Sequence, residues 1–174
     1  MKKFISILLV ALMLLSFVAC GKDTGDSTTK AEESTPASVT IRDDSFVYGD
    51  VALNIGEGIS ADTLKPLGEP LDKQSAPSCH FDGNDTIYIY DGLKIYTYAD
   101  GDKEIVYLIE ITSDVYSAKD GAKVGMTLDE IKTLLGAPSQ ETAVGLVYAI
   151  SDTTAIRFTI ADSLVTKIEY EEAI

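Results

Sequence analysis

Side chains capable of nucleophilic or acid–base chemistry are few in this sequence. Its 174 residues include one histidine, His80, and two cysteines, Cys20 and Cys79. Adjacent residues on a strand point to opposite faces, so Cys79 and His80 do not suit a nucleophile and its base. Common zinc sites need three or four nitrogen and sulfur ligands, more than this chain supplies. We therefore expect no enzyme, no catalytic residue, no metal site and no cofactor.

Two glycine- and aspartate-rich patterns could bind ligands, but each lacks a required part. Gly56-Glu57-Gly58-Ile59-Ser60-Ala61 has dinucleotide-loop spacing, yet Glu57 would place a carboxylate beside the pyrophosphate. Asp82-Gly83-Asn84-Asp85 and Asp100-Gly101-Asp102 are fragments of calcium loops without the terminal bidentate glutamate. Turn formation explains both aspartate motifs. Calcium binding at the acidic surface stays open as an alternative.

The charge balance excludes another class of partner. The chain carries 28 acidic and 14 basic side chains, for a net charge of −14. Proteins that bind nucleic acid need clustered lysine and arginine to displace counterions from phosphates, so we expect no nucleic-acid partner. With 45% hydrophobic residues, the chain is not a disordered acidic protein.

The first twenty residues have the pattern of an export signal. Met1-Lys2-Lys3 is basic, and Phe4 to Val18 is an uncharged apolar run. That run is shorter than the roughly 20 residues of a membrane span but matches the core of a signal peptide. Phe17-Val18-Ala19-Cys20 resembles a bacterial lipobox, which implies cleavage before Cys20 and attachment of lipid to its sulfur. We predict a lipoprotein signal peptide over residues 1–20.

A polar tether and an unpaired thiol follow from this prediction. Residues 21–38 contain no aromatic residue and no Val, Ile, Leu or Met, so they cannot bury enough apolar area to fold. The Ser/Thr/Glu-rich composition looks like that of Gram-positive surface lipoproteins, so we expect an extracytoplasmic location, lipid-anchored to the cell membrane. With Cys20 lipidated, Cys79 has no partner within the chain, and we expect it to be buried as a small hydrophobic residue.

The remaining sequence aligns with itself. Asn54 to Pro70 matches Lys123 to Pro138, which predicts two repeats over residues 39–116 and 117–174. In the second copy, Thr127 and Glu130 form a capping box, and Gly136 and Pro138 end the helix. Its apolar stripe comprises Leu128, Ile131, Leu134 and Leu135. In the first copy Pro66 limits the helix to one or two turns.

Three strands are expected after each helix. Alternating apolar residues and turn signals such as Asp91-Gly92 place them at 85–90, 93–98, 104–111, 146–150, 154–160 and 165–170. Each repeat is then a short helix packed on an antiparallel meander of three to four strands. The predicted fold class is α+β.

The second copy carries a family resemblance. Val124-Gly125-Met126-Thr127-Leu128-Asp129-Glu130-Ile131, leading to Leu135-Gly136-Ala137-Pro138, resembles the repeat opening of β-lactamase inhibitor proteins and of SmpA/BamE-type envelope lipoproteins. The two-repeat layout is closer to the inhibitor proteins, in which two such repeats present a curved sheet to a protein partner. The resemblance implies the fold, whereas one fold hosts many functions.

The tyrosines suggest a contact face. A two-residue turn at Asp91-Gly92 sets Tyr88, Tyr90 and Ile95 on one side of the sheet. Aligning the repeats assigns Tyr96 and Tyr98 to the core, and Tyr88, Tyr90, Ile95 and Leu108 then line the helix-free face. The equivalent face of the second repeat carries Arg157, Thr159, Lys167 and Glu169 and is polar. Either the tyrosine face is an exposed interaction site, or it packs against the other repeat or the N-terminal segment.

These observations predict a membrane-anchored, non-enzymatic protein-binding module, with the membrane reached through lipid on Cys20. The partner is expected to be a protein at the cell surface that contacts Tyr88, Tyr90, Ile95 and Leu108. Two alternatives remain: a solute- or calcium-binding surface lipoprotein, and an envelope-assembly accessory protein.

Overall fold

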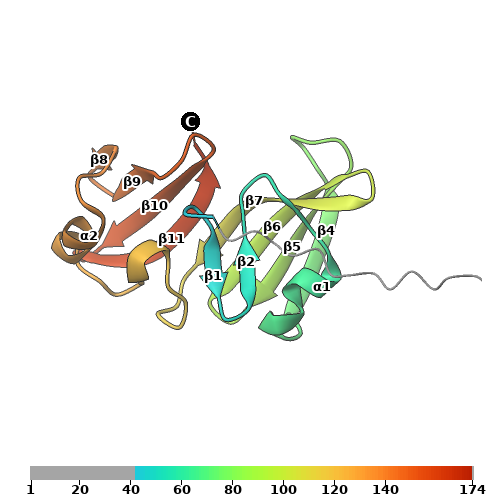
Figure 1. Ribbon diagram of the computed structural model, residues 1–174, viewed down its shortest axis with the longest axis horizontal. Helices are drawn as coiled ribbons and strands as arrows, with labels where there is room; N and C mark the ends of the chain where they lie inside the picture. Colours follow the sequence, from blue (N-terminus) through green and yellow to red (C-terminus); the bar gives the residue numbers. More distant parts are fainter. Residues whose placement is uncertain (1–41, 174) are drawn as a thin grey trace, which may run out of the picture. The chain divides into compact units, whose positions relative to one another are not determined.

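The computed structural model describes residues 42–173 (Figure 1). The predicted signal peptide (1–20), Cys20 and the predicted tether (21–38) lie outside these residues. Among residues 42–173, no helix is long and apolar enough to cross a membrane.

The described chain is an α+β fold dominated by one antiparallel sheet. Its two α-helices are short: α1 spans Ala61–Leu64 and continues as a 3-10 turn, η1, over Lys65–Leu67, and α2 spans Leu128–Leu135. A second 3-10 turn, η2, spans Lys119–Gly121. The strands are β1 (Phe46–Tyr48), β2 (Val51–Leu53), β3 (Gly58–Ile59), β4 (Asp72–Pro77), β5 (Asn84–Tyr90), β6 (Leu93–Asp100), β7 (Lys103–Ile111), β8 (Gln140–Thr142), β9 (Gly145–Ala149), β10 (Thr154–Ala161) and β11 (Leu164–Glu172). The six strands predicted from the sequence are present as β5, β6, β7, β9, β10 and β11.

The main sheet has nine strands and is joined at its centre by the last strand of each half. Its order is β4-β5-β6-β7-β11-β10-β9-β8, and β3 pairs with another part of β7 (Figure 1). At the centre, Ile111 of β7 lies opposite Ile168 of β11, and Leu108 lies opposite Glu171. Three strands therefore lie on each side of the central β7–β11 pair, and this pairing makes the two halves a single sheet.

The core lies on one face of this sheet. Along β5 and β6, buried residues alternate with half-buried ones, as a period of two requires, whereas the outer strands β4 and β8 are exposed throughout. Helices α1 and α2 add Leu64 and Ile131 to this core, and β1 and β2 add Phe46, Val51 and Leu53. We call the opposite side the helix-free face, because within residues 42–173 both α-helices and the β1–β2 hairpin pack on the core side.

Helix α2 has the predicted ends. Thr127 Oγ1 accepts a hydrogen bond from the Glu130 amide, and the Glu130 carboxylate accepts one from the Thr127 amide at 2.8 Å. Gly136 adopts a φ of +80° at the end of the helix, a conformation that glycine tolerates best. Ile131 is fully buried, but Leu134 is 40% exposed, so the predicted apolar stripe is narrower than expected. In the first half, Pro66 falls in η1 and keeps that helix short, as predicted.

The β1–β2 hairpin packs across the junction between the halves. Phe46 is fully buried and meets Tyr170 of β11 edge-on, with ring centroids 6.0 Å apart. It also contacts Tyr116 at 6.4 Å. One hairpin side chain thus touches aromatic residues that come before and after α2 in the sequence, an arrangement that the sequence analysis did not anticipate.

Candidate functional site

The tyrosine face predicted from the sequence was assigned to the wrong side of the sheet. Tyr88, Tyr90 and Ile95 are only 9%, 7% and 0% exposed and belong to the core. Leu108 is half-buried and, opposite Tyr96, lies on the helix-free face. Of the two alternatives left open, packing within the protein is therefore correct for Tyr88, Tyr90 and Ile95.

The error has a simple physical cause. The self-alignment placed Tyr96 over the core residue Phe158, but Ile95 is the fully buried residue. A shift of one position exchanges the two faces of a strand. The segment Ile87-Tyr88-Ile89-Tyr90 is apolar on both faces, so its pattern gave no signal against the shift.

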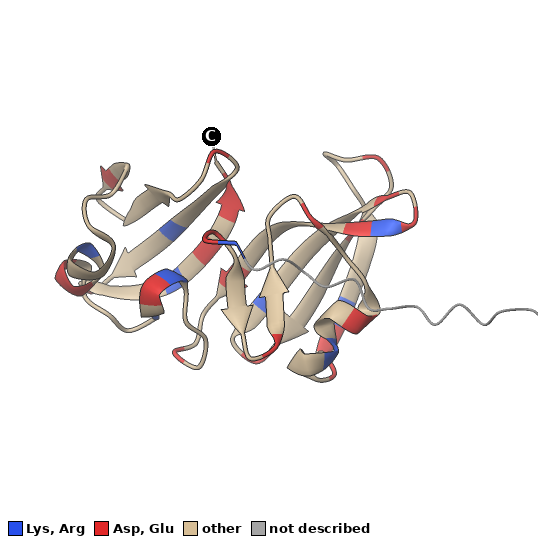
Figure 2. Cartoon of the chain, viewed as in Figure 1, with Lys and Arg blue, Asp and Glu red and all other residues tan. Residues whose placement is uncertain are grey.

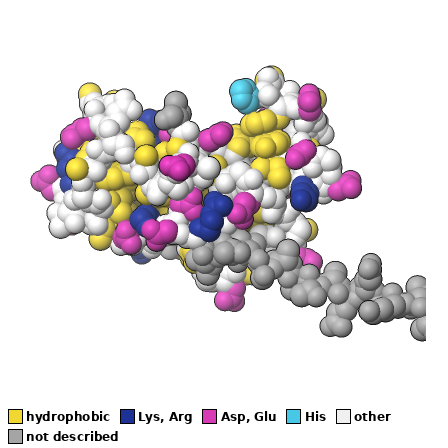
Figure 3. All heavy atoms as spheres, turned by 45° about the horizontal axis from the view of Figure 1, so that its top comes forward, with side chains coloured by type: hydrophobic (Ala, Val, Ile, Leu, Met, Phe, Trp, Pro, Cys, Tyr) yellow, Lys and Arg dark blue, Asp and Glu magenta, His cyan; other side chains and the backbone are white. Residues whose placement is uncertain are grey.

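The helix-free face of the first half carries a different set of aromatic rings, which we call the aromatic cluster: Phe81, Tyr96, Tyr98 and Tyr107. Phe81, from the loop between β4 and β5, stacks on Tyr98 with centroids 3.8 Å apart and planes 10° apart. Tyr107 lies 5.5 Å from Phe81 and 6.1 Å from Tyr96. All four side chains are half-buried. In Figure 3, hydrophobic side chains gather beside the single histidine with acidic side chains around them, and the His80 ring is 4.9 Å from that of Phe81.

A β-bulge explains the position of Tyr107. Tyr96 pairs with Leu108 and the next residue, Thr97, pairs with Val106, so Tyr107 is an extra residue in β7. On the other edge of β7, Val106 exchanges backbone hydrogen bonds with Gly56 and Glu57, whereas Leu108 already faces β11. Tyr107 therefore stands where β7 changes neighbours. Bulges often re-aim a side chain beside a functional site.

A cavity of about 300 Å³ opens beside β7, near the point where its pairing passes from the segment around Gly56 and Glu57 to β11. We call it the seam pocket. Three members of the aromatic cluster line one part of it, and three charged side chains line another. Its lining residues are Arg42, Ile55, Gly56, Glu57, Phe81, Tyr98, Val106, Tyr107, Thr153 and Glu172. The lining thus comes from the segments before β1 and β3, from the aromatic cluster, and from one end of the β10–β11 pair, where Thr154 lies opposite Glu172.

The charged side chains of the seam pocket differ in whether they have ion-pair partners within the protein. Arg42 pairs with Asp44 at 2.9 Å and with Glu57 at 2.7 Å, while its Nη2 is buried without a hydrogen-bond partner among the described residues. Glu172, by contrast, is exposed and forms no ion pair within the described residues. Burial, with a smaller effect of nearby Asp85, raises the pKa of Tyr107, so its hydroxyl stays protonated at neutral pH.

Paired charges cover the helix-free face from the end of the β6–β7 pair into the second half. Glu110 binds Lys94 at 2.7 Å and approaches Lys167 at 4.0 Å. Arg157 binds Glu171 at 2.6 Å, and acidic and basic residues share β10 and β11 in Figure 2. The polar character predicted for Arg157, Lys167 and Glu169 is confirmed. The aromatic cluster is therefore confined to the first half of this face.

One cluster on the core side contains residue types used in acid–base catalysis. Lys73 Nζ donates to the hydroxyl of Tyr88 at 2.8 Å, and that hydroxyl donates to Glu104. The hydrogen bond to Tyr88 raises the pKa of Lys73, and burial raises the pKa of Tyr88. Both groups therefore hold their protons more firmly, the opposite of what a general base requires.

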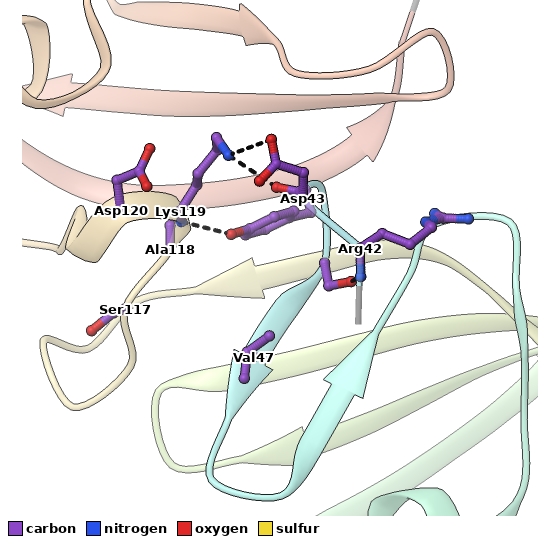
Figure 4. A pocket seen from close by; sticks show the side chains of 9 residues that line it. Arg42, Asp43, Val47, Ser117, Ala118, Lys119 and Asp120 are labelled. Carbon is purple, nitrogen blue, oxygen red and sulfur yellow. Dashed lines mark hydrogen bonds and ion pairs between the residues drawn. The ribbon is translucent and has the colours of Figure 1, made fainter. Parts of the chain in front are cut away.

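A second cavity, of about 230 Å³, lies between the β1–β2 hairpin and η2 (Figure 4). Lys119 Nζ lies 3.0 Å from the carbonyl oxygen of Asp43 and 3.3 Å from its carboxylate. The Lys119 amide donates to the hydroxyl of Tyr170 at 2.8 Å. The Arg42 side chain extends away from Lys119 (Figure 4). Arg42, Asp43 and Lys119 already have ion-pair partners, whereas Asp120, which also lines this cavity, forms no ion pair within the described residues.

The remaining motifs lie in exposed loops. Cys79 is a free, exposed thiol in the turn between β4 and β5, so its predicted burial was wrong. It lies outside any strand, where no sheet face is available to cover it. Within residues 42–173, no group of three or more His, Cys, Asp or Glu side chains could hold a metal ion.

One solved structure is similar to part of this chain. The chain is similar to the crystal structure of a DUF4309 family protein (YjgB) from Bacillus subtilis subsp. subtilis str. 168, with a TM-score of 0.43 and 18% sequence identity. The match covers 70% of this chain and 82% of that chain. No protein-family model matches the sequence, and no curated protein matches it.

Phe81 and Tyr107 are the site residues that sequence reasoning missed. Phe81 lies outside every predicted strand, and Tyr107 occupies a bulge that no local pattern announces.

Proposed function

We propose that this chain is an extracytoplasmic lipoprotein, anchored through lipid on Cys20, whose folded part is a non-enzymatic protein-binding module at the cell surface. The observation that carries the binding role is the aromatic cluster on the helix-free face. Tyrosine and other aromatic side chains dominate the energetics of protein interfaces because they combine a large apolar area with a polar end.

The contact residues of this proposal differ from those predicted from the sequence. The core residues Tyr88, Tyr90 and Ile95 are replaced by Phe81, Tyr96, Tyr98 and Tyr107, and Leu108 is retained. The aromatic cluster ends at the paired charges of the second half, so it forms an apolar centre with a polar border. Protein interfaces commonly have this organisation.

The two-repeat architecture is part of the same proposal. We take residues 39–116 and 117–174 as tandem repeats similar to those of β-lactamase inhibitor proteins. This is supported by the order of elements, because a short helix followed by four strands occurs in each half. The two halves differ most on the helix-free face, as expected if only one of them kept a contact surface.

Site-specific photo-crosslinking on intact cells tests the binding role. A benzophenone-bearing phenylalanine analogue replaces Tyr98 in the full-length lipoprotein, and matched proteins carry it at Leu71 or Val144, which are 75% and 67% exposed. We expect one discrete protein adduct from position 98 and none from the two control positions. Equal labelling at all three positions, or none at position 98, would contradict the proposed contact face.

Anchoring is tested separately. Replacing Cys20 with Ala should move the protein from the membrane fraction to the medium, because the lipid would no longer be attached. A Cys79→Ala variant removes the other thiol and should stay with the membrane. Membrane retention of the Cys20→Ala protein would overturn the lipid anchor.

A further inference from the structure

We propose that the seam pocket receives the guanidinium group of an arginine side chain from the protein partner. This inference rests on the proposed protein-binding function and specifies the chemistry that the partner brings. It follows from three features of the pocket: its aromatic wall, its one unpaired carboxylate and its size.

The aromatic wall suits a planar cation. Phe81 and Tyr98 are nearly parallel at 3.8 Å, and Tyr107 is tilted against them by 49° and 43° respectively. The face of an aromatic ring is electron-rich and attracts cations, and a guanidinium can also stack flat against it. An arginine stem can cover apolar surface while its head group reaches polar atoms.

The free charge in the seam pocket is negative. Arg42 pairs with both Asp44 and Glu57, so these three side chains together carry one net negative charge, although Arg42 Nη2 itself has no hydrogen-bond partner among the described residues. Glu57 also accepts a hydrogen bond from Asn54 at 2.8 Å. Glu172 is left without an ion pair among the described residues and lines the same pocket as Phe81, Tyr98 and Tyr107. A guanidinium stacked on the tyrosines could direct two N–H groups toward the Glu172 carboxylate.

The surroundings strengthen this preference. Asp85 lies opposite Tyr98 in the sheet, and its Oδ1 is buried without a hydrogen-bond partner. That carboxylate adds negative potential beneath the rings. On the same face, Glu110 and Glu171 already bind Lys94 and Arg157. An incoming cation therefore meets an unpaired acidic group at the seam pocket and paired ones beside it.

The size of the cavity fits one side chain. Its volume of about 300 Å³ is at the lower end of the range for ligand pockets. At protein interfaces, side chains that contribute most to binding often fill a pocket on the partner. A partner that presents one arginine at its contact surface would fill the seam pocket while its neighbouring residues cover Tyr96 and Leu108.

The test uses N-acetyl-arginine N-methylamide as the probe and its uncharged citrulline analogue as the matched probe. Each is titrated into the full mature lipoprotein in detergent micelles, with ¹³C-labelled tyrosine rings observed by NMR. We expect saturable shifts of Tyr98 and Tyr107, with arginine binding about tenfold more tightly than citrulline. Salt should weaken the arginine binding more than the citrulline binding.

Two variants identify the groups responsible. Glu172→Gln should bring the arginine-to-citrulline affinity ratio close to one, and Tyr98→Leu should lower it while keeping an apolar wall. Asp114→Asn removes an exposed carboxylate outside the pocket and should leave the ratio unchanged. Equal binding of both probes to the native protein, or a ratio unaffected by Glu172→Gln, would overturn the arginine assignment.

Failure of this inference is distinguishable from failure of the proposed function. If position 98 crosslinks a cell-surface protein but the arginine probe shows no preference, the binding role stands and the arginine assignment falls. If the arginine probe binds selectively but no protein is crosslinked, the protein-binding function itself is overturned.

Discussion

Asp44 accepts a hydrogen bond of 2.7 Å from the hydroxyl of Ser151, which lies 107 residues later in the sequence. Thr154 donates a second one to the same carboxylate oxygen at 3.0 Å, and Arg42 pairs with the other oxygen at 2.9 Å. Asp44 is only 6% exposed. One carboxylate thus ties the segment before β1 to the start of β10.

Removing the charge of Asp44 should destabilise the fold. We expect Asp44→Asn to lower the free energy of unfolding by about 1–3 kcal/mol. The native carboxylate is buried and accepts hydrogen bonds from three donors, whereas the asparagine amide is neutral and its NH₂ group would face one of those donors. Urea denaturation followed by circular dichroism measures the change. Asp43→Asn is the control, since that side chain is 98% exposed and should change stability by less than about 0.5 kcal/mol. Equal midpoints for the two variants would contradict this role of Asp44.

The contribution of Asp44 should depend on pH. Burial tends to raise the pKa of Asp44, but hydrogen bonds from Ser151, Thr154 and Arg42 outweigh it and hold the pKa below 3.8. Because the folded-state pKa is lowered, the stabilisation is present above 3.8 and is lost as the pH falls through the folded-state pKa. The stability difference between native and Asp44→Asn proteins should therefore narrow below pH 3.8. Urea titrations at several pH values check this, and a constant difference down to acid unfolding would refute it.

The assignment of the sheet faces predicts a contrast between two neighbouring aliphatic residues. Ile95→Ala should cost about 2–5 kcal/mol, because the side chain is fully buried and a cavity would remain. Leu108→Ala, on the helix-free face, should cost clearly less, since that side chain is already half in contact with water. The denaturant midpoints of the two variants test this prediction. A larger loss of stability for Leu108→Ala than for Ile95→Ala would contradict the assignment of Ile95 to the core face.

The capping box of α2 should contribute measurably to stability. Thr127→Ala removes the hydroxyl that accepts from the Glu130 amide and should cost about 0.5–2 kcal/mol. Thr133→Ala makes the same chemical change within the helix and should be neutral or slightly stabilising, because alanine favours helix more than threonine does. Thermal melting of both variants provides the comparison. A Thr127→Ala protein as stable as Thr133→Ala would show that the cap contributes nothing.

Gly145 lies where two strands approach closely. A Cβ atom there would stand 2.1 Å from the carbonyl oxygen of Phe158 in the paired strand β10. Gly145→Ala should therefore shift the backbone of β9 and destabilise the protein. At Gly101 a Cβ atom has open space around it, so Gly101→Ala should cost only the backbone strain of an alanine at a φ of +60°. Denaturation of the two variants in parallel should rank Gly145→Ala as clearly less stable, and the reverse ranking would be inconsistent with this packing.

Local features were predictable wherever neighbouring residues determine them. The strands β5, β6 and β7, the turn at Asp91-Gly92 and both ends of α2 follow from alternation, turn chemistry and capping, which act over a few residues. The side of the sheet that Tyr88 and Tyr96 occupy was not predictable in the same way. Both faces of β5 and β6 are apolar, and the choice between them depends on the hairpin and helices that cover one face.

The sequence by itself determined the class of fold, the short helices, the order of strands along the chain and the acidic character of the protein. Only the tertiary structure decided that β7 pairs with β11, that β7 has a bulge at Tyr107, and that Phe81 stacks on Tyr98. These relationships join residues distant in the sequence, and their free energy comes from burial and strand pairing between segments. No local pattern carries that information. The aromatic cluster, the seam pocket and the pairing of Asp44 with Ser151 therefore become visible only when the chain is folded.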